Sequence, residues 1–460
     1  MNARYFDAII IGAGQAGPSL AGRLSAAGMK VAIIERHLVG GTCVNTGCKP
    51  TKTLVATAYA THTARRGSEF GFSVAGPIAV DMAAVAARAR KVILDSRKGN
   101  EDWLASMSNV ELIRGHARFE SSEVVTVNNE RLTAPRIFIN VGGRATVPDL
   151  PGVNDVPLLT NTDMVALDAL PRHLVVVGGS YIGLEFAQMY RRFGADVTIV
   201  ERTDRLIGRE DPDVSQAIRE ILETEGITVR TSASCIGFRA HDAGVAVSVD
   251  CREGAPSVIG SHVLLAVGRR PNTDDLGLER ARIATDARGY IVVDDRLQTN
   301  VPGVWALGDC NGRGAFTHTA YNDFEIVAAN LLNGGDRRVS QRVPGYALYI
   351  DPPLARVGMT DTEAAKSGRR LLRSKREMTR VGRAVEKGET KGFMKIVADA
   401  DSQRILGAAI LGTSGDEAIH GILDLMSADQ PIKALRWAVP IHPTVSELIP
   451  TLLEDLSSAG

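Results

Sequence analysis

The sequence FDAIIIGAGQAGPSLAGRLSAAGMKVAIIE, residues 6–35, decides the fold of this chain. An apolar run enters the motif GAGQAG, a helical stretch follows, and a second apolar run ends in Glu35. This order predicts a strand, a tight turn, a helix and a parallel strand, the unit that holds a dinucleotide. Gly12 makes the turn, Gly14 lets a pyrophosphate approach the backbone, and Gly17 lets the helix pack closely on the strand. Glu35 is expected to hydrogen-bond ribose hydroxyls.

A second unit of this kind starts at residue 174, where LVVV leads into GGSYIG, a helix and a further strand. Gly178 and Gly183 occupy the first and third glycine positions of the motif. Ser180 takes the middle position, and its small side chain is expected to leave room for a pyrophosphate. The chain is therefore expected to bind two dinucleotides.

The acid that ends the second unit bears on the choice of coenzyme. Glu201 follows the strand DVTIV, and a carboxylate there bonds the ribose 2′-hydroxyl and repels a 2′-phosphate. This favours NADH over NADPH. Arg202 and Arg205 follow at once and leave NADPH as the alternative, because either cation is able to bind a 2′-phosphate.

Between the two units lies the sequence GGTCVNTGCKPTK, residues 40–52. Cys43 and Cys48 have four residues between them, and Cys48 precedes a helix-like run. Unpaired N–H groups at a helix start favour an anion, so a thiolate is favoured at Cys48. Two cysteines this close interchange readily between dithiol and disulfide. A pair of structural cysteines or half of a zinc site is the alternative, although the sequence offers no second Cys/His pair with suitable spacing.

Residues 40–52 resemble the redox-active disulfide of the flavin-dependent pyridine nucleotide–disulfide oxidoreductases, which include glutathione reductase, dihydrolipoamide dehydrogenase and mercuric reductase. The resemblance covers nearly the whole chain. It implies FAD at the N-terminal site and electron flow from NAD(P)H through FAD to the Cys43–Cys48 disulfide. Cys48 would face the flavin, and Cys43 would be the exposed interchange thiol. Lys49 departs from the family, which usually has an apolar residue there; this cation is expected to lower a thiol pKa, to favour an anionic substrate, or to point into solvent.

The resemblance also assigns residues around the flavin. Lys52 is expected to pair with Glu185 near the flavin N5, and Tyr181 is expected to cover the nicotinamide face of the flavin until the coenzyme displaces it. A helix that begins near Thr317 would aim its positive end at the flavin ring. Further cofactor-binding positions are implied at Gly41, Thr42, Gly142, Gly268 and Asp309.

The segment AVPIHPTVSE near the C-terminus matches the acid–base dyad of the family. His442 and Glu447 would act on the disulfide of the partner subunit in a homodimer. A histidine near its ordinary pKa of ~6.5 is able to take a proton from an attacking thiol and return it later. Glu447 would fix the tautomer of His442 and raise its pKa.

These features predict an α/β chain with two Rossmann-like dinucleotide-binding domains, one for FAD and one for NAD(P), and a C-terminal α+β dimerisation domain. The expected divisions are an FAD domain with the redox disulfide (1–150), an NAD(P)H domain (151–272), a return to the central FAD region (273–340) and a dimerisation domain (341–460).

Composition excludes several other classes of protein. Lys and Arg total 53, as do Asp and Glu, so no global field attracts nucleic acid or an anionic membrane. No apolar run approaches the ~20 residues of a membrane span, and the start of the chain lacks a signal-peptide layout. Only five cysteines occur in 460 residues, which is typical of a reducing compartment, so a cytoplasmic enzyme is expected. Cys235, Cys251 and Cys310 are predicted to be structural, and no metal cofactor site is expected.

The identity of the electron acceptor is the open question. Residues 208–212 and the overall pattern resemble mercuric reductase, but Ser457 and Ser458 stand where that enzyme has paired cysteines, and it typically lacks the dyad. The related copper-reducing flavoproteins of reactive-chlorine resistance fit better. We therefore predict a mercuric-reductase-like NAD(P)H reductase of a small disulfide or a metal ion. The alternatives are dihydrolipoamide dehydrogenase and, from another class, a redox-sensing flavoprotein without turnover.

Overall fold

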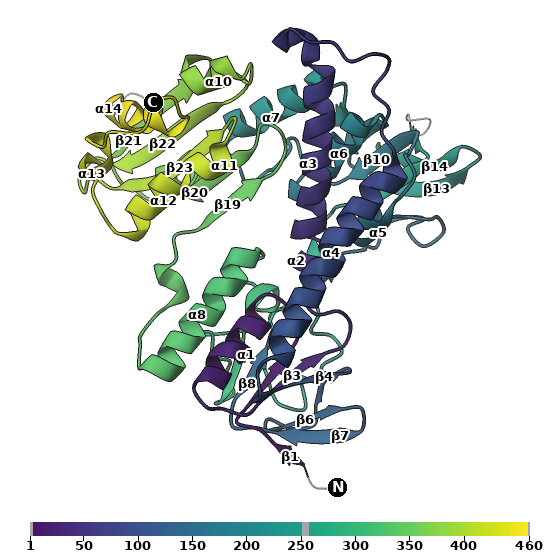
Figure 1. Cartoon of the computed structure of the whole chain (residues 1–460), viewed down its shortest axis with the longest axis vertical. Coiled ribbons are helices and arrows are strands. Elements are labelled where there is room, and N and C mark those ends of the chain that lie inside the picture. Colours follow the sequence, from purple (N-terminus) through teal and green to yellow (C-terminus); the bar gives the residue numbers. More distant parts are fainter. Residues whose placement is uncertain (1–2, 251–256, 459–460) are drawn as a thin grey trace.

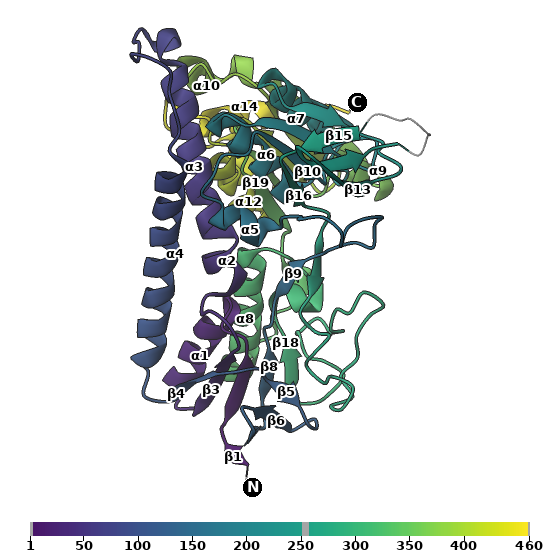
Figure 2. The ribbon, with the colours of Figure 1, turned by 90° about the vertical axis from the view of Figure 1, so that its right-hand side faces the viewer.

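A computed structural model describes residues 3–250 and 257–458 of the chain and shows three groups of elements, each built around a sheet (Figures 1 and 2). The N-terminal group lies at one end of the molecule, and the other two lie together at the opposite end. The predicted α/β class is confirmed: the chain has two parallel sheets, in each of which one strand leads into a glycine turn and a helix, and a C-terminal α+β part.

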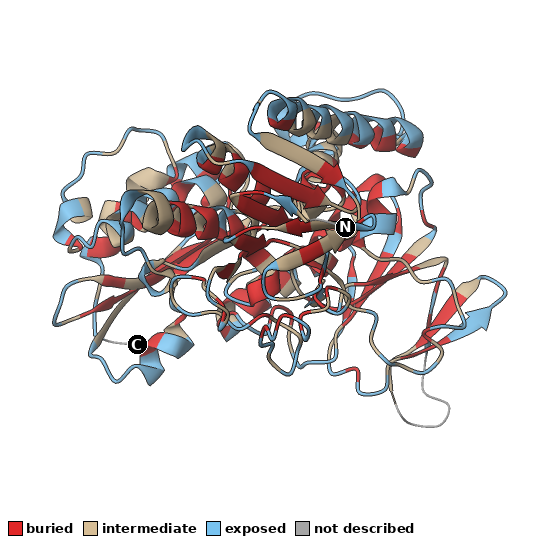
Figure 3. Cartoon of the chain, turned by 90° about the horizontal axis from the view of Figure 1, so that it is seen from below, coloured by how far each residue is buried: buried red, intermediate tan, exposed pale blue. Residues whose placement is uncertain are grey.

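The N-terminal group contains a five-stranded parallel sheet of order β18-β8-β2-β3-β4. Its strands are β2 (Ala8–Ile11), β3 (Val31–Glu35), β4 (Val110–Arg114), β8 (Ile137–Ile139) and β18 (Val304–Ala306). Every residue of β2 is buried, because both faces of the sheet are covered (Figure 3). Thus residues 304–306, far along the chain, complete the sheet that residue 8 begins.

Helices cover one face of this sheet and a second, smaller sheet lies against the other. Ile10 and Ile33 share a buried cluster with Leu20 of α1 (Ala16–Ala26) and Phe324 of α8 (Thr317–Asn333). Ile9 and its neighbours on the opposite face share a cluster with the small sheet. That sheet has the order β1-β7-β6-β5, with strands β1 (Arg4–Tyr5), β5 (Arg118–Phe119), β6 (Val124–Val127) and β7 (Glu130–Thr133).

Two long helices run side by side from the N-terminal group toward the other end of the molecule (Figure 2). They are α3 (Cys48–Arg65) and α4 (Met82–Ala105), and the short α2 (Gly41–Asn45) precedes them. Leu54 of α3 and Val85 of α4 are buried in one cluster with Leu184 of α6 (Tyr181–Phe193). Cys48 therefore begins a helix that spans two parts of the molecule, and Cys43 lies on the short helix just before it.

The second parallel sheet has the order β12-β11-β10-β16. Its strands are β10 (His173–Val177), β11 (Asp196–Val200), β12 (Thr228–Arg230) and β16 (His262–Leu265), and its helices are α5 (Asn161–Ala166), α6 and α7 (Pro212–Thr224). An antiparallel sheet of β13 (Gly237–His241), β14 (Gly244–Ser248) and β15 (Ser257–Gly260) lies against it. The chain enters and leaves this group through β9 (Gly143–Ala145) and β17 (Arg269–Pro271), which pair antiparallel.

The C-terminal group is an antiparallel sheet of order β19-β20-β23-β22-β21 with helices against it. Its strands are β19 (Gly345–Leu348), β20 (Leu354–Gly358), β21 (Leu371–Glu377), β22 (Phe393–Asp399) and β23 (Ile405–Leu411). Its helices are α9 (Asp361–Lys366), α10 (Gly382–Glu386), α11 (Gly415–Ala418), α12 (His420–Ser427), α13 (Lys433–Arg436) and α14 (Ile449–Glu454). Among the described residues, no helix combines the length and the apolar character that a membrane crossing needs.

A buried ion-pair cluster joins the second and third groups, and we call it the charged junction. Arg356 of β20 is 3% exposed and its Nε lies 2.8 Å from Oε2 of Glu210, which precedes α7. Lys395 of β22 lies 3.1 Å from Asp211 at the start of α7. These contacts fix the C-terminal sheet against the coenzyme-binding group, because a buried charge needs its partner in place.

Candidate active site

The turn between β2 and α1 has the geometry of a phosphate cradle. Gly12 has φ +104°, and a Cβ there would lie 2.3 Å from the Asn140 carbonyl oxygen, so no other residue fits. A Cβ at Gly17 would lie 2.4 Å from the Gly12 carbonyl oxygen, which shows how closely α1 approaches the turn. No side chain caps the first N–H groups of α1. They remain able to bind a pyrophosphate, with the positive end of the helix dipole behind them.

The turn before α6 repeats this arrangement. Gly178 has φ +114°, and a Cβ at Gly183 would lie 2.1 Å from the Gly178 carbonyl oxygen. Ser180 is the residue before α6, and its hydroxyl makes no capping hydrogen bond to the helix. The serine in the middle position therefore leaves the N–H groups of the α6 N-terminus unused.

Glu35 at the end of β3 and Glu201 directly after β11 make the same kind of hydrogen bonds to the backbone. Oε2 of Glu35 accepts a hydrogen bond from Ala13 N at 2.9 Å, and its Oε1 accepts one from His37 N at 2.8 Å. Oε2 of Glu201 accepts from Gly179 N at 2.6 Å, and its Oε1 accepts from Thr203 N at 2.7 Å. Each carboxylate thus lies beside its glycine turn, where it would contact the ribose of a bound dinucleotide.

The crossing between the first two groups brings Gly142, Gly268 and Asp309 together. Asn272 N donates to Gly142 O at 3.0 Å, and Thr146 N donates to Gly268 O at 3.0 Å. Nη2 of Arg269, the residue after Gly268, lies 3.1 Å from Oδ2 of Asp309. Asp309 lies in the 3₁₀ helix Gly308–Asn311 that follows β18. Within the described part of the chain, the other carboxylate oxygen of Asp309, Oδ1, accepts no hydrogen bond. An acid so placed fits a polyhydroxyl chain.

Gly41 and Thr42 begin α2, directly before the first cysteine. Gly41 has φ +60°, and a Cβ there would lie 2.9 Å from Cα of Gly14. The start of α2 therefore touches the dinucleotide turn, which connects the redox segment to the predicted flavin site. The glycine cradle, the free α1 N-terminus, Glu35 and Asp309 together fit FAD.

Cys48 is the first residue of α3, and Cys43 lies within α2. Sγ of Cys48 lies 3.2 Å from Oγ1 of Thr317, the first residue of α8, so two helix N-termini meet at this sulfur. The hydrogen bond with Cys43, followed by that with Thr317 and the charge of Lys52, lowers the pKa of Cys48 to about 6, although partial desolvation of the sulfur by neighbouring protein atoms opposes the shift. The same hydrogen bond and burial raise the pKa of Cys43. The reduced pair therefore keeps its proton on Cys43 and its charge on Cys48.

The solvent exposure of the two cysteines differs from the expectation based on the sequence. Cys48 is exposed and Cys43 is half-buried, whereas Cys43 was expected to be the exposed one. The neighbours of each sulfur are more informative, because Cys48 contacts the start of α8, the helix that the family resemblance places at the flavin ring. Cys310 is fully buried and donates to Leu307 O, as a structural thiol does, and Cys251 lies outside the described residues.

We expect the thiolate of Cys48 to disappear as the pH falls through about 6. Above that pH the thiol is ionised, and below it the proton returns, since a depressed pKa stabilises the charged form. The absorbance of the reduced protein at the thiolate band should therefore show a midpoint near pH 6. Thr317→Val should move that midpoint upward, because one donor to the thiolate is lost. A midpoint at the ordinary cysteine value of ~8.5 would contradict this assignment.

Lys52 and Glu185 form the ion pair that the resemblance implied, with the carboxylate buried and the lysine half-buried. Nζ of Lys52 lies 2.7 Å from Oε2 and 2.9 Å from Oε1 of Glu185, which is 4% exposed. Tyr349 N also donates to Glu185 at 3.0 Å, and Lys52 lies 4.6 Å above the Tyr349 ring. One turn of α3 separates Lys52 from Cys48, so the ammonium group stands on the same helix end as the thiolate.

Tyr181 lies at the start of α6 within a group of aromatic rings. Its ring meets those of Phe316 and Tyr346 edge-on at 5.8 and 5.3 Å, and its buried hydroxyl has no hydrogen-bond partner among the described residues. Tyr346 is anchored by a hydrogen bond to Glu210 of the charged junction. Packing against these two aromatic rings holds the Tyr181 ring in place.

His442 and Glu447 are brought together in the segment between α13 and α14, which lies apart from α2 and the start of α3 (Figure 1). Nδ1 of His442 lies 3.0 Å from Oε2 of Glu447, while the His442 side chain is 80% exposed. The neighbouring apolar side chains are also exposed, with Trp437 at 75%, Val439 at 95% and Ile441 at 80%. Such a patch around an oriented histidine is what a subunit interface needs.

Some residues of the site carry no local sequence signal. Thr317 beside Cys48, Tyr346 beside Tyr181, and Asp323 are of this kind. Asp323 is 2% exposed, accepts from Gly308 N at 2.8 Å and pairs with Arg342, so it holds the turn that carries Asp309. Long-range contacts such as these are visible only in the folded chain.

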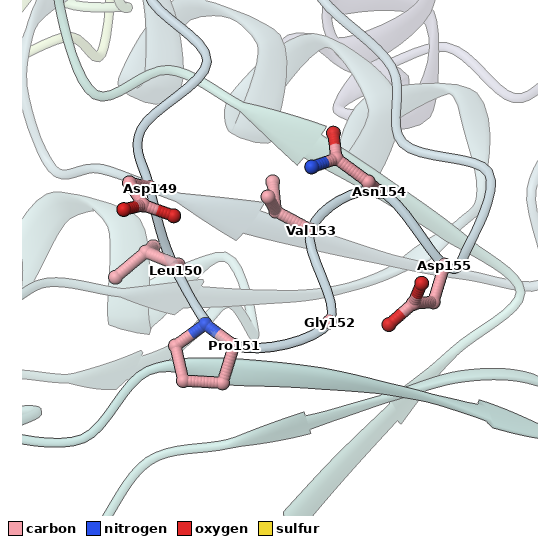
Figure 4. Close-up of a pocket in the computed structure, with 7 residues that line it drawn as sticks. All are labelled: Asp149, Leu150, Pro151, Gly152, Val153, Asn154 and Asp155. Atoms are coloured by element: carbon pink, nitrogen blue, oxygen red, sulfur yellow. The ribbon is translucent and has the colours of Figure 1, made fainter.

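A hollow elsewhere on the surface is unrelated to this chemistry. It is lined by residues 149–155 of a single loop at the crossing between the first two groups (Figure 4). The side chains are those of two aspartates, an asparagine and small apolar residues, without a thiol, a histidine or a lysine. Across residues 3–250 and 257–458, no group of three or more metal-ligating side chains is found.

Comparisons with known proteins agree with this geometry. The family model described as pyridine nucleotide-disulphide oxidoreductase matches residues 6–323, and the model of its dimerisation domain matches residues 344–453. The probable pyridine nucleotide-disulfide oxidoreductase RclA of Escherichia coli (strain K12) is 36% identical over 96% of this chain and 97% of its own length. A dihydrolipoyl dehydrogenase of Thermus scotoductus is 33% identical over 96% of each chain. A mercuric reductase of Bacillus cereus is 31% identical over 96% of this chain and 70% of its own.

A solved structure described as the Cu(II) complex of the HOCl-induced flavoprotein disulfide reductase RclA from Escherichia coli matches with a TM-score of 0.89. It is 34% identical and covers 99% of both chains. The likeness therefore extends over all three groups of elements.

Proposed function

This chain belongs to the pyridine nucleotide–disulphide oxidoreductase family, and from that premise we propose that it reduces a small-molecule disulfide with electrons from NAD(P)H. It is a flavoprotein enzyme, and the dimerisation domain supports a homodimer. The observation that carries the proposal is the placement of Cys48 between the N-termini of α3 and α8, with Cys43 beside it and the Lys52–Glu185 pair one helical turn away.

When bound, FAD supplies a two-electron carrier between NAD(P)H and the Cys43–Cys48 disulfide. The residues that would hold it are Gly12, Gly14, Gly17, Glu35, Gly41, Thr42, Lys52, Gly142 and Asp309. Gly178, Gly183, Glu201 and Gly268 belong to the proposed NAD(P)H site or its exit. The corresponding domains remain a proposal, with divisions at residues 150, 272 and 340.

The chemistry of the thiols follows from their protonation. In the reduced pair, the sulfur of Cys43 attacks one sulfur of the acceptor after its proton has passed to His442 of the partner subunit. This forms a Cys43–acceptor mixed disulfide and releases one thiolate, which takes the proton back. The Cys48 thiolate then attacks Cys43, so the Cys43–Cys48 disulfide forms and the second acceptor thiolate leaves. The protein dithiol loses two electrons and the acceptor disulfide gains them.

We propose NADH as the preferred coenzyme, and Glu201→Ala tests this. Loss of a carboxylate that accepts from a ribose hydroxyl should raise KM for NADH about tenfold. KM for NADPH should stay the same or fall, because that carboxylate repels its 2′-phosphate. Steady-state dye reduction with each coenzyme measures both.

Glu201→Gln is the matched control, since it keeps an acceptor for Gly179 N–H while removing the charge. Equal losses with both coenzymes in Glu201→Ala would show that the residue only holds the turn, and the coenzyme preference would be withdrawn.

A metal ion is the second candidate acceptor, and a specific observation favours it. The relative RclA is described in a complex with Cu(II), and this chain is similar to it over its full length. Thiolates bind soft metal ions well. The Cys43–Cys48 pair would supply the thiolates for such an ion.

The deciding experiment is anaerobic oxidation of NADH and NADPH by the FAD-loaded enzyme. Lipoamide and oxidised glutathione are compared with Hg(II) and Cu(II). Fast turnover with a disulfide and none with the metals supports the proposal, and lipoamide alone would favour dihydrolipoamide dehydrogenase. Turnover with metals alone moves the assignment to a metal-ion reductase. If neither NADH nor NADPH reduces the flavin, the alternative of a redox-sensing flavoprotein without turnover is favoured.

A further inference from the structure

Three cations line the contact between α3 and α4 next to the redox cysteines, and we call this surface the α3–α4 seam. Nζ of Lys49 donates to Ser96 Oγ at 3.0 Å. Nη1 of Arg88 donates to Thr53 O at 2.8 Å and approaches Thr57 Oγ1 at 3.2 Å, and Nε of Arg97 donates to Asn45 Oδ1 at 2.9 Å. Lys49 and Arg88 thus span between α3 and α4 through uncharged oxygens, and Arg97 of α4 reaches the last residue of the short α2 in the same way.

These cations have no carboxylate partner within the part of the chain that the structure describes, whereas every acid of α4 has a partner of its own. Asp95 pairs with Lys91 at 2.5 Å and Asp102 pairs with Lys98 at 2.7 Å. Glu101 pairs with Arg114 at 2.5 Å. The helix α3 contains no aspartate or glutamate at all. The seam therefore keeps an uncompensated positive charge.

The seam begins at the redox pair. Lys49 is the residue after Cys48, and Asn45, which holds Arg97, lies between the two cysteines in the sequence. The Lys49 charge also acts on Cys43, where it opposes the rise in pKa. In both overall views α3 and α4 lie next to one another from the redox end onward (Figures 1 and 2). Lys49 is exposed, so its ammonium group is open to a ligand.

We propose that the α3–α4 seam binds an anionic group of the acceptor, which makes Lys49 a specificity-determining residue for carboxylate-bearing disulfides. This inference rests on the proposed function and names the class of substrate for the same site. An ammonium group with a hydroxyl beside it, followed by two guanidinium groups, matches the carboxylates of a small disulfide. An acceptor anchored there has its sulfur atoms brought toward Cys43, the neighbour of this charge.

Alkylation of the reduced dithiol tests the charge without any turnover. The FAD-loaded enzyme is reduced with dithiothreitol, freed of reductant, and treated with iodoacetate or iodoacetamide, which differ in charge. Monoalkylation of the Cys43–Cys48 pair is followed by mass spectrometry of the peptide. We expect Lys49→Met to lower the ratio of the iodoacetate rate to the iodoacetamide rate about threefold, as loss of one nearby solvated charge predicts.

Two matched variants control for general effects. Lys49→Arg keeps the charge and should keep the ratio. Lys91→Met removes an exposed charge of α4 that Asp95 already neutralises, and the ratio should again stay unchanged. Added salt should reduce the difference between the parent enzyme and Lys49→Met, because exposed charges are screened. An unchanged ratio in Lys49→Met, or an equal fall in Lys91→Met, would overturn the proposal.

Turnover extends the test to substrates. Oxidised glutathione, which is anionic, is compared with cystamine, which carries amines in place of carboxylates. Lys49→Met should lower kcat/KM for oxidised glutathione relative to cystamine by a factor similar to that of the alkylation ratio. If the parent enzyme reduces neither of these disulfides nor lipoamide while the alkylation ratio still falls, the proposed function fails and the anion-binding seam stands.

Discussion

Cys48→Ser is expected to bind FAD and reduce dyes with NADH as the parent enzyme does, but to lose disulfide reduction by on the order of 10³-fold or more. The hydroxyl of serine does not ionise near neutral pH and is unable to form the Cys43–Cys48 disulfide that releases the second half of the acceptor. The mixed disulfide on Cys43 would therefore persist. Anaerobic stopped-flow with a chosen disulfide, together with mass spectrometry of the trapped adduct, measures both effects.

Cys310→Ala is the matched control, because that thiol is fully buried and away from the exchange chemistry. It should keep both dye reduction and disulfide turnover once folding has been verified. Undiminished disulfide turnover in Cys48→Ser would remove the assigned pair from the reaction path. Loss of dye reduction together with disulfide turnover would instead point to a damaged flavin site.

His442→Ala should lower kcat for a disulfide by about 10²- to 10⁴-fold, the usual contribution of a general acid–base group. Dye reduction should be unaffected, because it does not pass through the Cys43–Cys48 disulfide on which the His442–Glu447 pair is proposed to act. His420→Ala removes another exposed histidine of the C-terminal group and serves as the control. An equal loss of dye reduction in His442→Ala would show a general structural effect.

Mixing the two inactive variants tests whether the dyad acts across the dimer. If each site combines cysteines of one subunit with the histidine of the other, a heterodimer of Cys48→Ser and His442→Ala contains one intact site. Random exchange of subunits would then restore about a quarter of the parent activity. If cysteines and histidine came from the same subunit, no intact site would form and the mixture would stay inactive.

The sequence predicts those parts of the site that depend on local geometry. Glycines at turns, an acid at a strand end and a cysteine at a helix start each follow from a short pattern, and the structure places Gly12, Glu35 and Cys48 accordingly. The Lys52–Glu185 pair was predicted only through the family resemblance. No periodicity connects residues that are 133 positions apart.

Other features were beyond the sequence because they depend on how distant elements pack. Thr317 reaches Cys48 across 269 positions, and Tyr346 reaches Tyr181 from a strand of another group. The cations of α4 form a surface with Lys49 only where α4 packs beside α3. Lys49 was left with three possible roles until its contact with Ser96 was known.

The charged junction has a consequence for how this protein can be divided or recombined. Arg356 and Lys395 on one side are matched to Glu210 and Asp211 on the other, and all four are buried. A polypeptide that ends before β19 would expose the carboxylates of Glu210 and Asp211, which are buried in the whole chain. A C-terminal part moved to another protein would carry Arg356 and Lys395 without their partners. Exchange of domains between relatives should therefore succeed only when the acids and the cations of the charged junction are transferred together.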